Sequence, residues 1–294
     1  MINGVLNVWK EAGFTSHDVV AKLRGILHQK KIGHTGTLDP DATGVLPVCL
    51  GKGTRLCDML TDETKTYEAL LHLGIATDTQ DMSGTVTAEA PVTVTEEEVR
   101  DCIASFVGEQ QQVPPMYSAL KVDGRKLCDL ARAGVTVERA ARPVHIFSVE
   151  ILSIELPRVR MRVCCSKGTY IRTLLEDIAA AMGQKGTMSA LRRTTAGVYT
   201  EADAHTLEEI QAAKDTGPEA LQALMLPVES VFESLPLLVA EPRVEQHLYN
   251  GCPTSRYPAA DGRYRVRNSE GQFLGLANIT GGVLKVEKLF VERN

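Results

Sequence analysis

The sequence lacks the marks of several large classes of protein. Its seven cysteines are odd in number and form no C-x-x-C pair, which argues against both a disulfide framework and a zinc cage. No window approaches the about 18 consecutive apolar residues that a membrane helix needs. The first residues, MINGVLNVWKEAGF, contain neither a basic stretch nor a continuous apolar run, so we expect no signal peptide. These absences predict a protein of the reducing cytoplasm.

Internal repeats and low-complexity runs are also missing, and the composition is that of an ordinary globular protein. Of the 294 residues, 44 % are apolar and 23 % are charged, so the chain can bury a sizeable core. This length favours one large domain, or a large domain with a small one.

The charged residues are distributed unevenly along the chain. The net charge of −5, taken alone, argues against a nucleic-acid partner. However, residues 62–110 carry 11 acidic and 2 basic side chains, whereas residues 121–193 carry 7 acidic and 14 basic ones, a local net charge of +7. Such a basic segment could hold a phosphate backbone, or it could form an ordinary solvated surface. Charge alone leaves both interpretations open.

Periodicity and capping signals predict an α+β chain. Thr15 with Asp18, and Thr95 with Glu98, have the spacing of capping boxes, so each pair should open a helix. Around position 67 apolar and polar residues alternate, and at 159–165 apolar residues alternate with arginines, as in half-buried strands. In chain order the patterns predict a helix at about 16–29, a buried strand at 45–50, a strand from 67 to 73, a helix from after Thr95 to Gly108, a strand at 159–165, and a helix at 169–182 that stops at Gly183.

Two segments indicate how the chain divides. Residues 110–145 are rich in Lys and Arg and interrupted by prolines and glycines, which predicts a long excursion from the core. After the prolines at 227, 236 and 242, short strand-like pieces follow at 263–267, 272–277 and 284–286. We therefore predict a main domain over residues 1–234 and a small β-rich domain over residues 235–294.

The densest cluster of unusual residues is KIGHTGTLDPDATGVLP, residues 31–47. Its glycines let the backbone turn sharply and approach a ligand closely, and Pro40 keeps Asp39 out of the helical region. Such a loop holds the Asp39 carboxylate in one orientation, as a catalytic group requires. A purely structural turn is the alternative, which composition alone leaves open.

Three other kinds of site share some of these residues. Asp39-Pro-Asp41-Ala-Thr43 matches the D-x-D-x-T of aspartyl-phosphate phosphatases, but these need an apolar strand directly before the first Asp, and residues 33–37 are not one. A calcium loop starting at Asp39 would have Leu50 where a bidentate Glu is required. Gly33 and Gly36 do not have the spacing or the lysine of a phosphate-binding loop. An aspartyl-phosphate phosphotransferase remains a minor alternative.

Two further stretches hold candidate side chains. In Ser166–Arg172 a basic strand ends in a glycine turn that opens a helix, so Tyr170 and Arg172 should point beyond the strand end. An aromatic anchor beside a surface arginine is the alternative there. Tyr67, in Lys65-Thr-Tyr67, stands at the start of a strand, a position that more often belongs to the core.

Taken together, these motifs resemble those of the tRNA pseudouridine-55 synthases, the TruB family. The resemblance covers roughly residues 1–230 and begins with Gly33–Pro40 and Ala42–Pro47. Residues 235–294 resemble, more weakly, the small PUA-like RNA-binding domain of many bacterial members. Between these regions the matching motifs follow in order: Lys65–Tyr67, Pro115–Lys121, Ala131–Gly134, Ser166–Arg172 and Leu191–Arg193.

The resemblance implies a fold, a reaction and a partner. The fold is a mixed, mostly antiparallel sheet flanked by helices, with the site in a cleft across it. The reaction isomerises a uridine in the T loop of tRNA to pseudouridine: the base is flipped out, and uracil is cleaved from its ribose and reattached. It needs no cofactor or metal. The partner is the T-arm of tRNA, and we expect a monomer without an obligatory protein partner.

The resemblance also assigns roles to single residues. Asp39 is the reactive carboxylate, acting on the sugar or the base, and Arg172 is its ion-pair partner, which should lower the pKa of Asp39. Tyr67 stacks on the base, while Tyr170 and Leu191 form walls of the pocket.

RNA contacts outside the pocket follow from the same resemblance. His34 contacts the RNA near the gap that the flipped base leaves, the basic segment 121–193 contacts the backbone, and the excursion at about 110–145 closes over the RNA. The alternative function is an RNA-binding or tRNA-folding module whose catalysis is incidental.

Overall fold

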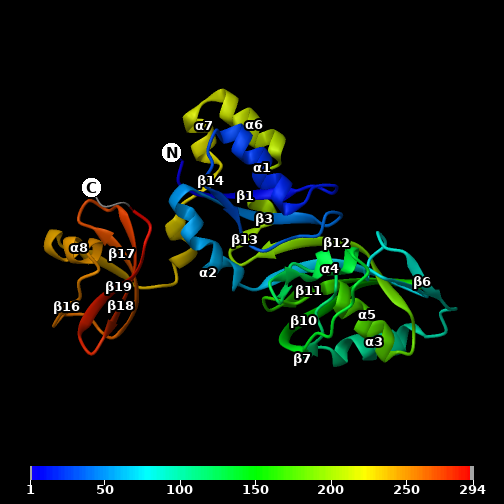
Figure 1. Ribbon diagram of the computed structural model, residues 1–294. Helices are drawn as coiled ribbons and strands as arrows, with labels where there is room; N and C mark the ends of the chain where they lie inside the picture. The colour runs from blue at the N-terminus through cyan, green and yellow to red at the C-terminus, as the bar shows by residue number, and fades with distance from the viewer. Residues whose placement is uncertain (1, 292–294) are drawn as a thin grey trace.

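The computed structural model describes residues 2–291 and shows a large module and a small one (Figure 1). Residues 1 and 292–294, the outer ends of the two predicted domains, lie outside the described residues. The large module is built on one ten-stranded sheet with the main order β14-β1-β3-β12-β4-β11-β10-β7, in which β2 pairs with β3 and β13 with β12. Its strands are β1 (Gly4–Lys10), β2 (Ile32–His34), β3 (Thr43–Leu50), β4 (Lys65–Leu73), β7 (Gly108–Gln112), β10 (Arg142–Glu155), β11 (Arg158–Cys165), β12 (Gly186–Ala196), β13 (Tyr199–Thr200) and β14 (Met225–Leu226).

The sheet is antiparallel except where its two halves meet. There β3 and β12 run parallel, with Thr43 opposite Arg192 and Gly44 opposite Arg193. A Cβ on Gly44 would lie 2.2 Å from the carbonyl oxygen of Arg193, so only glycine permits this approach. The loop before β3, which holds Asp39, is thereby placed at the centre of the sheet. The predicted mixed, mostly antiparallel sheet flanked by helices is confirmed.

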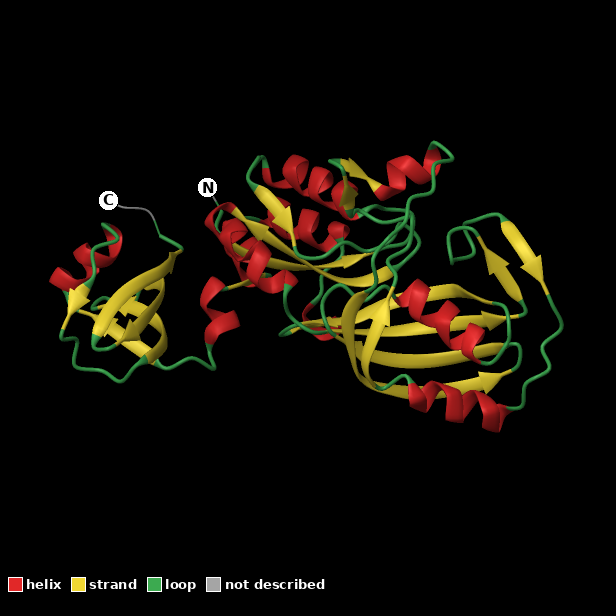
Figure 2. Cartoon of the chain, turned by 60° about the horizontal axis from the view of Figure 1, so that its bottom comes forward, coloured by secondary structure: helices red, strands yellow, loops and turns green. Residues whose placement is uncertain are grey.

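Helices cover the two halves of the sheet separately (Figure 2). Apolar residues of α3 and α5 pack on β4 and β11, and those of α1, α6 and α7 pack on β1 and β3. The helices are α1 (Ser16–Leu27), α2 (Cys57–Thr61), α3 (Glu96–Ser105), α4 (Leu127–Arg132), α5 (Ile171–Ala181), α6 (Leu207–Thr216), α7 (Pro218–Ala223) and α8 (Pro242–Tyr249), with 3-10 turns η1 (Gly51–Leu56), η2 (Glu201–Asp203) and η3 (Val228–Phe232).

The capping signals located two helix starts correctly. Thr15 and Asp18 form a reciprocal capping box at the start of α1, and Thr95 and Glu98 do so at α3. The prediction that Gly108 closes α3 was wrong. The helix ends at Ser105, and Gly108, at φ +111°, is the first residue of β7.

Two connections extend from the sheet. One contains the hairpin of β5 (Ile75–Thr77) and β6 (Val86–Glu89). The other joins the neighbouring antiparallel strands β7 and β10, and it carries α4 and the hairpin of β8 (Lys121–Val122) and β9 (Arg125–Lys126). The segment predicted to leave the core at 110–145 therefore does so between residues 113 and 141.

The small module is a five-stranded sheet with α8 packed against it, as the predicted β-rich tail requires. The module shares a hydrophobic cluster with the large one: Phe232 stacks on Phe273 and contacts Phe290, and Leu276 and Phe290 belong to the same buried cluster as Val5. The strand order is β15-β17-β18-β19-β16, from β15 (Leu237–Ala240), β16 (Thr254–Ser255), β17 (Gly262–Asn268), β18 (Phe273–Thr280) and β19 (Val283–Leu289).

Candidate active site

Asp39 lies in the loop between β2 and β3, and buried groups on both sides hold that loop. The backbone N–H of Leu38 donates to Ser16 Oγ on the first residue of α1, at 2.9 Å. The ammonium of Lys10, at the end of β1, donates to the carbonyls of Pro40 and Ala42 at 2.9 and 2.6 Å. The residues before and after Asp39 are therefore fixed by main-chain hydrogen bonds, which leaves the carboxylate itself free for other contacts.

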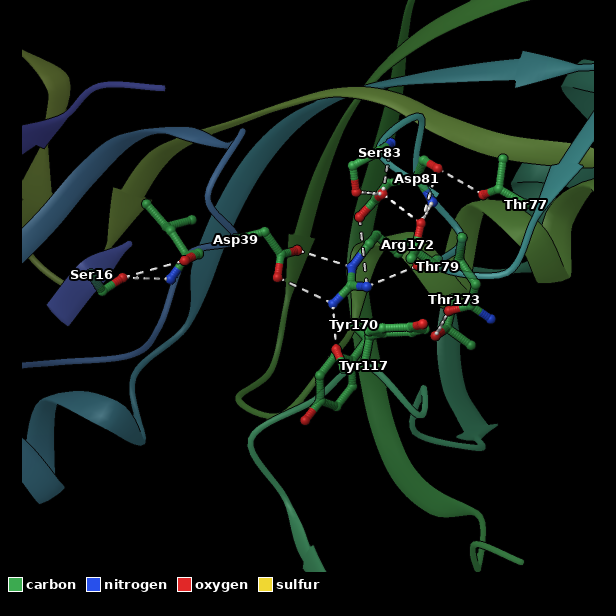
Figure 3. Close-up of polar contacts among 12 residues, drawn as sticks. Ser16, Asp39, Thr77, Thr79, Asp81, Ser83, Tyr117, Tyr170, Arg172 and Thr173 are labelled. Atoms are coloured by element: carbon green, nitrogen blue, oxygen red, sulfur yellow. Dashed lines mark hydrogen bonds and ion pairs between the residues drawn. The ribbon is translucent and has the colours of Figure 1, made fainter. Parts of the chain in front are cut away.

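The Asp39 carboxylate forms a two-point ion pair with Arg172 on the first turn of α5 (Figure 3). Arg172 Nε lies 2.9 Å from Oδ2, and Nη2 donates to Oδ1 at 3.1 Å. Two parallel N–H···O contacts fix the orientation of the carboxylate as well as its position. The side chain of Asp39 is 34 % exposed, so it remains accessible to a ligand.

Arg172 is itself buried, with a side chain 6 % exposed, and its remaining donors are also used. Nη1 donates to the carbonyl of Thr79 at 2.9 Å, and Nη2 to the carbonyl of Tyr117 at 2.9 Å. Nη1 also lies 3.7 Å from Oδ2 of Asp81, in the loop between β5 and β6. Arg172 thus joins three segments that are far apart in the sequence.

The expected effect of Arg172 on the pKa of Asp39 is outweighed by burial. Burial raises the pKa of the Asp39 carboxyl above its ordinary value, and Arg172 opposes that shift without cancelling it. The negative charge of Asp81 adds to the rise. The prediction of a lowered pKa was therefore wrong, because it considered the ion pair and left out the loss of solvent.

Asp39 and Arg172 open into a cavity of about 1020 Å³. Tyr67 from β4, Tyr170 before α5 and Leu191 from β12 line the same cavity. This volume is at the upper end of the about 300–1,000 Å³ typical of small-molecule sites, and leaves room for a nucleoside. Five of the six side chains singled out in the sequence thus come together at one site.

Both tyrosines keep their phenol protons at neutral pH. Burial raises the pKa of Tyr67, against the opposing effect of the nearby Arg193 guanidinium. Burial also raises the pKa of Tyr170, whose backbone is held by the side-chain amide of Gln112. Two neutral aromatic rings beside an ion pair suit a planar, polar ligand such as a nucleobase.

The sixth residue, His34, is not among the residues of the described range 2–291 that line this cavity. It lies on β2, and its ring packs edge-on against that of His17 at a centroid distance of 5.4 Å. Its Nδ1 atom is buried and has no hydrogen-bond partner among residues 2–291. Burial lowers the pKa of His34, so the ring is neutral near pH 7.

The predicted alternation at 159–165 is confirmed, and arginines of β11 and β12 form ion pairs across the sheet. Arg162 pairs with Glu68 at 2.9 Å and with Glu150 at 2.6 Å, and Arg192 pairs with Glu68 at 3.0 Å. Glu68 follows the cavity residue Tyr67 on β4, so this row of ion pairs lies on the opposite face of the sheet. Arg162 and Arg192 are thus paired with acids on adjacent strands and point away from the cavity.

Several residues of the site were missed in the sequence. Lys10 is fully buried, and burial lowers its pKa to about 8. Arg193 is 1 % exposed, and its Nε donates to the carbonyl of Val45 at 2.7 Å. The one available signal was the position of Lys10, at the end of the largely apolar strand GVLNVWK. Asp81 gave no signal, because only the fold brings it to Arg172.

Other kinds of site find less support in the geometry. An aspartyl-phosphate enzyme needs its Asp directly after an apolar strand, whereas β2 ends at His34 and a loop separates it from Asp39. Residues 2–291 bring together no three His, Cys, Asp or Glu side chains that could hold a metal ion. In the same range, every helix is too short or too polar to cross a membrane.

Two solved structures resemble this chain over nearly its whole length. "Structure of H/ACA RNP bound to a substrate RNA containing 2'-deoxyuridine" matches with a TM-score of 0.75 and 27 % identity, over 99 % of this chain and 86 % of the other. "Crystal Structure of a Cbf5-Nop10-Gar1 Complex" matches with a TM-score of 0.75 and 29 % identity, over 99 % and 85 %. This chain therefore has the fold found in these two complexes, with the Asp39–Arg172 pair at the centre of its sheet.

Sequence comparison gives the family. Residues 24–171 match the TruB family pseudouridylate synthase N-terminal domain, and residues 172–233 match the tRNA pseudouridylate synthase B C-terminal domain. The tRNA pseudouridine synthase B of Ralstonia pickettii is 44 % identical over 98 % of this chain and 94 % of its own length. That of Clostridium perfringens strain 13 is 42 % identical over 99 % and 100 %. The chain belongs to the TruB family of pseudouridylate synthases, which are isomerases.

Proposed function

We propose that this chain isomerises uridine to pseudouridine at position 55, in the T loop of tRNA. Membership of the TruB family supports the reaction, and the relatives named tRNA pseudouridine synthase B support tRNA as the substrate. The observation that carries the proposal is the Asp39 carboxylate, held at two points by a buried arginine and open to a cavity of nucleoside size.

The reaction moves one bond within a single nucleoside. The bond between N1 of uracil and the ribose carbon breaks, the base turns, and C5 bonds to the same carbon. C5 loses its proton to the solvent and N1 gains one, so no electrons are exchanged with a second reactant. Asp39 acts on the sugar or the base as the nucleophile or electrostatic partner. Tyr67 stacks on the base, and the walls at Tyr170 and Leu191 keep it from leaving.

The uridine must leave its stack before it reaches Asp39. Flipping a base costs a few kcal/mol, and stacking on an aromatic ring returns about 1–3 kcal/mol per base. Within the proposal, His34 contacts the RNA at the gap left behind, outside the cavity. The connection 113–141 closes over the bound RNA, and its α4 already supplies Cys128 and Arg132 to the cavity lining.

The proposal extends to the organisation of the protein. Residues 1–234 would form the catalytic domain, and residues 235–294 a PUA-like domain that contacts RNA. The enzyme would act as a monomer in the cytoplasm and without a cofactor, since the isomerisation has no net redox change and no energy input.

The decisive experiment maps pseudouridine by mass spectrometry in unmodified tRNA treated with wild type and Asp39→Asn. Wild type should form pseudouridine in the T loop, whereas Asp39→Asn should form none and still bind tRNA. Asp41→Asn is the matched control, because Asp41 lines the same cavity from the same loop but is exposed and has no ion pair with Arg172. Undiminished product from Asp39→Asn would remove Asp39 from the mechanism. Modification at another site would overturn position 55.

A further inference from the structure

Gln112, the last residue of β7, is a buried polar side chain that the reaction scheme does not use. It is 4 % exposed, and both ends of its amide bond to the backbone of Tyr170. The Tyr170 N–H donates to Gln112 Oε1 at 2.8 Å, and Gln112 Nε2 donates to the Tyr170 carbonyl at 3.1 Å. The side chain therefore pairs with Tyr170 much as a neighbouring strand would.

This contact lies at the start of the helix that carries Arg172. Tyr170 is the N-cap residue of α5, and its side chain makes no capping hydrogen bond. Its carbonyl also accepts the first helical bond, from the N–H of Leu174 at 3.0 Å. A helix start needs partners for its free backbone groups. Because Gln112 supplies them from another segment, it fixes the N-cap of α5, which lies two residues before Arg172.

The chain that follows Gln112 returns to the same helix. The Tyr117 carbonyl accepts the hydrogen bond from Arg172 Nη2 at 2.9 Å (Figure 3). Between the two contacts lie Pro114 and Pro115, both buried, whose rings restrict the backbone. Residues 112–117 are thus attached to the first turn of α5 at both ends. They also begin the connection 113–141 that reaches the cavity.

We propose that Gln112 is a positioning residue for the isomerisation: through the backbone of Tyr170, it aligns Tyr170 and Arg172 with the Asp39 carboxylate. The inference rests on the proposed function and adds to it a residue that touches neither the substrate nor Asp39. A reacting group displaced by about 1 Å can slow a reaction about 100-fold. Loss of the clamp should therefore act on the chemical step more than on tRNA binding.

The test compares Gln112→Ala with Gln111→Ala in the full-length protein. Gln111 is the matched control, since it precedes Gln112 on β7 and its side chain is exposed. The rate of pseudouridine formation under single-turnover conditions with saturating tRNA should fall about 10- to 100-fold in Gln112→Ala. The Kd for tRNA should change less than about threefold, and the Tyr170 amide should lose its protection from hydrogen exchange. Gln111→Ala should match wild type in all three measurements.

A second variant keeps the test decisive if Gln112→Ala does not fold. Gln112→Glu retains the acceptor for the Tyr170 N–H, but its ionised carboxylate cannot donate to the Tyr170 carbonyl. Gln112→Glu should keep the protection of the Tyr170 amide and show a rate between those of wild type and Gln112→Ala. If the alanine variant is unfolded, the rate of Gln112→Glu should still lie below that of wild type. A wild-type rate in Gln112→Glu would then overturn the inference.

Failure of this inference and failure of the proposed function look different. An active wild type that is equalled by Gln112→Ala overturns the positioning role alone. A loss in tRNA affinity as large as the loss in rate does the same, because it assigns Gln112 to binding. A wild type that forms no pseudouridine overturns the proposed function together with the inference.

Discussion

Replacement of Lys10 by methionine should misplace the loop that holds Asp39, although Lys10 is not among the described residues that line the cavity. The Lys10 side chain is fully buried, and its ammonium donates to the carbonyls of Glu11 and Pro40, each at 2.9 Å, and of Ala42 at 2.6 Å. Lys10→Met keeps most of the length of the side chain and removes all three donors. The carbonyls of Pro40 and Ala42, which follow Asp39, then lose a group that fixes them.

The effect on stability is a difference of two terms. A buried carbonyl left without a partner costs about 1–3 kcal/mol. This cost falls on Ala42, because the Pro40 carbonyl still accepts from the N–H of Gly13 at 3.0 Å and Glu11 is exposed. Against this, burial lowers the pKa of Lys10 from 10.5 to about 8, which corresponds to about 3 kcal/mol of penalty on the charged form that the variant no longer carries. The net loss should be a few kcal/mol at most. The effect on rate should be larger, about 100-fold for a shift of the carboxylate by about 1 Å.

Lys65→Met separates these two effects. Lys65 is also buried with its pKa lowered to about 8, and it donates to the carbonyls of Leu60, Thr61 and Glu63 at 3.5, 2.6 and 2.5 Å. None of these carbonyls belongs to the loop that holds Asp39. Urea unfolding should show similar losses of stability for the two variants, and single-turnover rates should show the large loss in Lys10→Met. Equal rates in both variants, or a rate near wild type in Lys10→Met, would refute the role of Lys10 in placing Asp39.

Three further outcomes are expected. Arg172→Lys should lower the single-turnover rate at least 100-fold, while tRNA still binds in a filter assay. The reason is that one ammonium cannot replace four hydrogen bonds at two carboxylate oxygens and two carbonyls. A loss in rate below tenfold would contradict this. Because burial raises the pKa of Asp39, its ionised form is destabilised in the folded state. The unfolding free energy of wild type relative to Asp39→Asn should therefore fall as the pH rises through that raised pKa, and denaturation at a series of pH values would show a flat difference if the reasoning fails. Phe232→Ala should lower the unfolding free energy by about 3–5 kcal/mol, because the buried ring packs between the two modules. Urea denaturation measures this loss, and a value below about 1 kcal/mol would contradict a shared core.

The parts of the fold that could be predicted from sequence are those with local signals. Thr15 with Asp18 marked the start of α1, since both halves of a capping box lie within four residues. Gly183, two residues beyond α5 and at φ +69°, marked the end of that helix. The glycine and proline loop around Asp39 was visible because the strain of a tight turn restricts which residues can form it.

The long strands β10 and β12 could not be predicted, for a reason visible in their pairing. In β12 the register shifts between Met188 and Ala190 and again between Arg193 and Thr195. β10 has two such shifts as well. Each bulge moves the following side chains to the other face of the sheet, which breaks the alternation by which a strand is recognised.

Buried lysines and arginines were the second feature that could not be predicted from the sequence. A lysine or arginine normally indicates exposure, so residue type alone gave no reason to expect Lys10, Lys65 and Arg193 inside the protein. Each in fact satisfies backbone carbonyls inside the protein. Arg162 of β11 is more exposed, but its charge is paired with Glu68 and Glu150 on the two adjacent strands. Net charge along the chain therefore overstated the basic surface available to RNA.

The aromatic cluster between the two modules has a consequence for how the modules can move relative to each other. Phe232, Phe273 and Phe290 pack against one another, and Arg55 of the large module donates to the Leu289 carbonyl of the small one. With side chains from both modules interlocked in this way, the C-terminal part cannot swing independently as a tethered arm would. The spacing between the two modules is therefore set by packed side chains and not by the length of the chain that connects them.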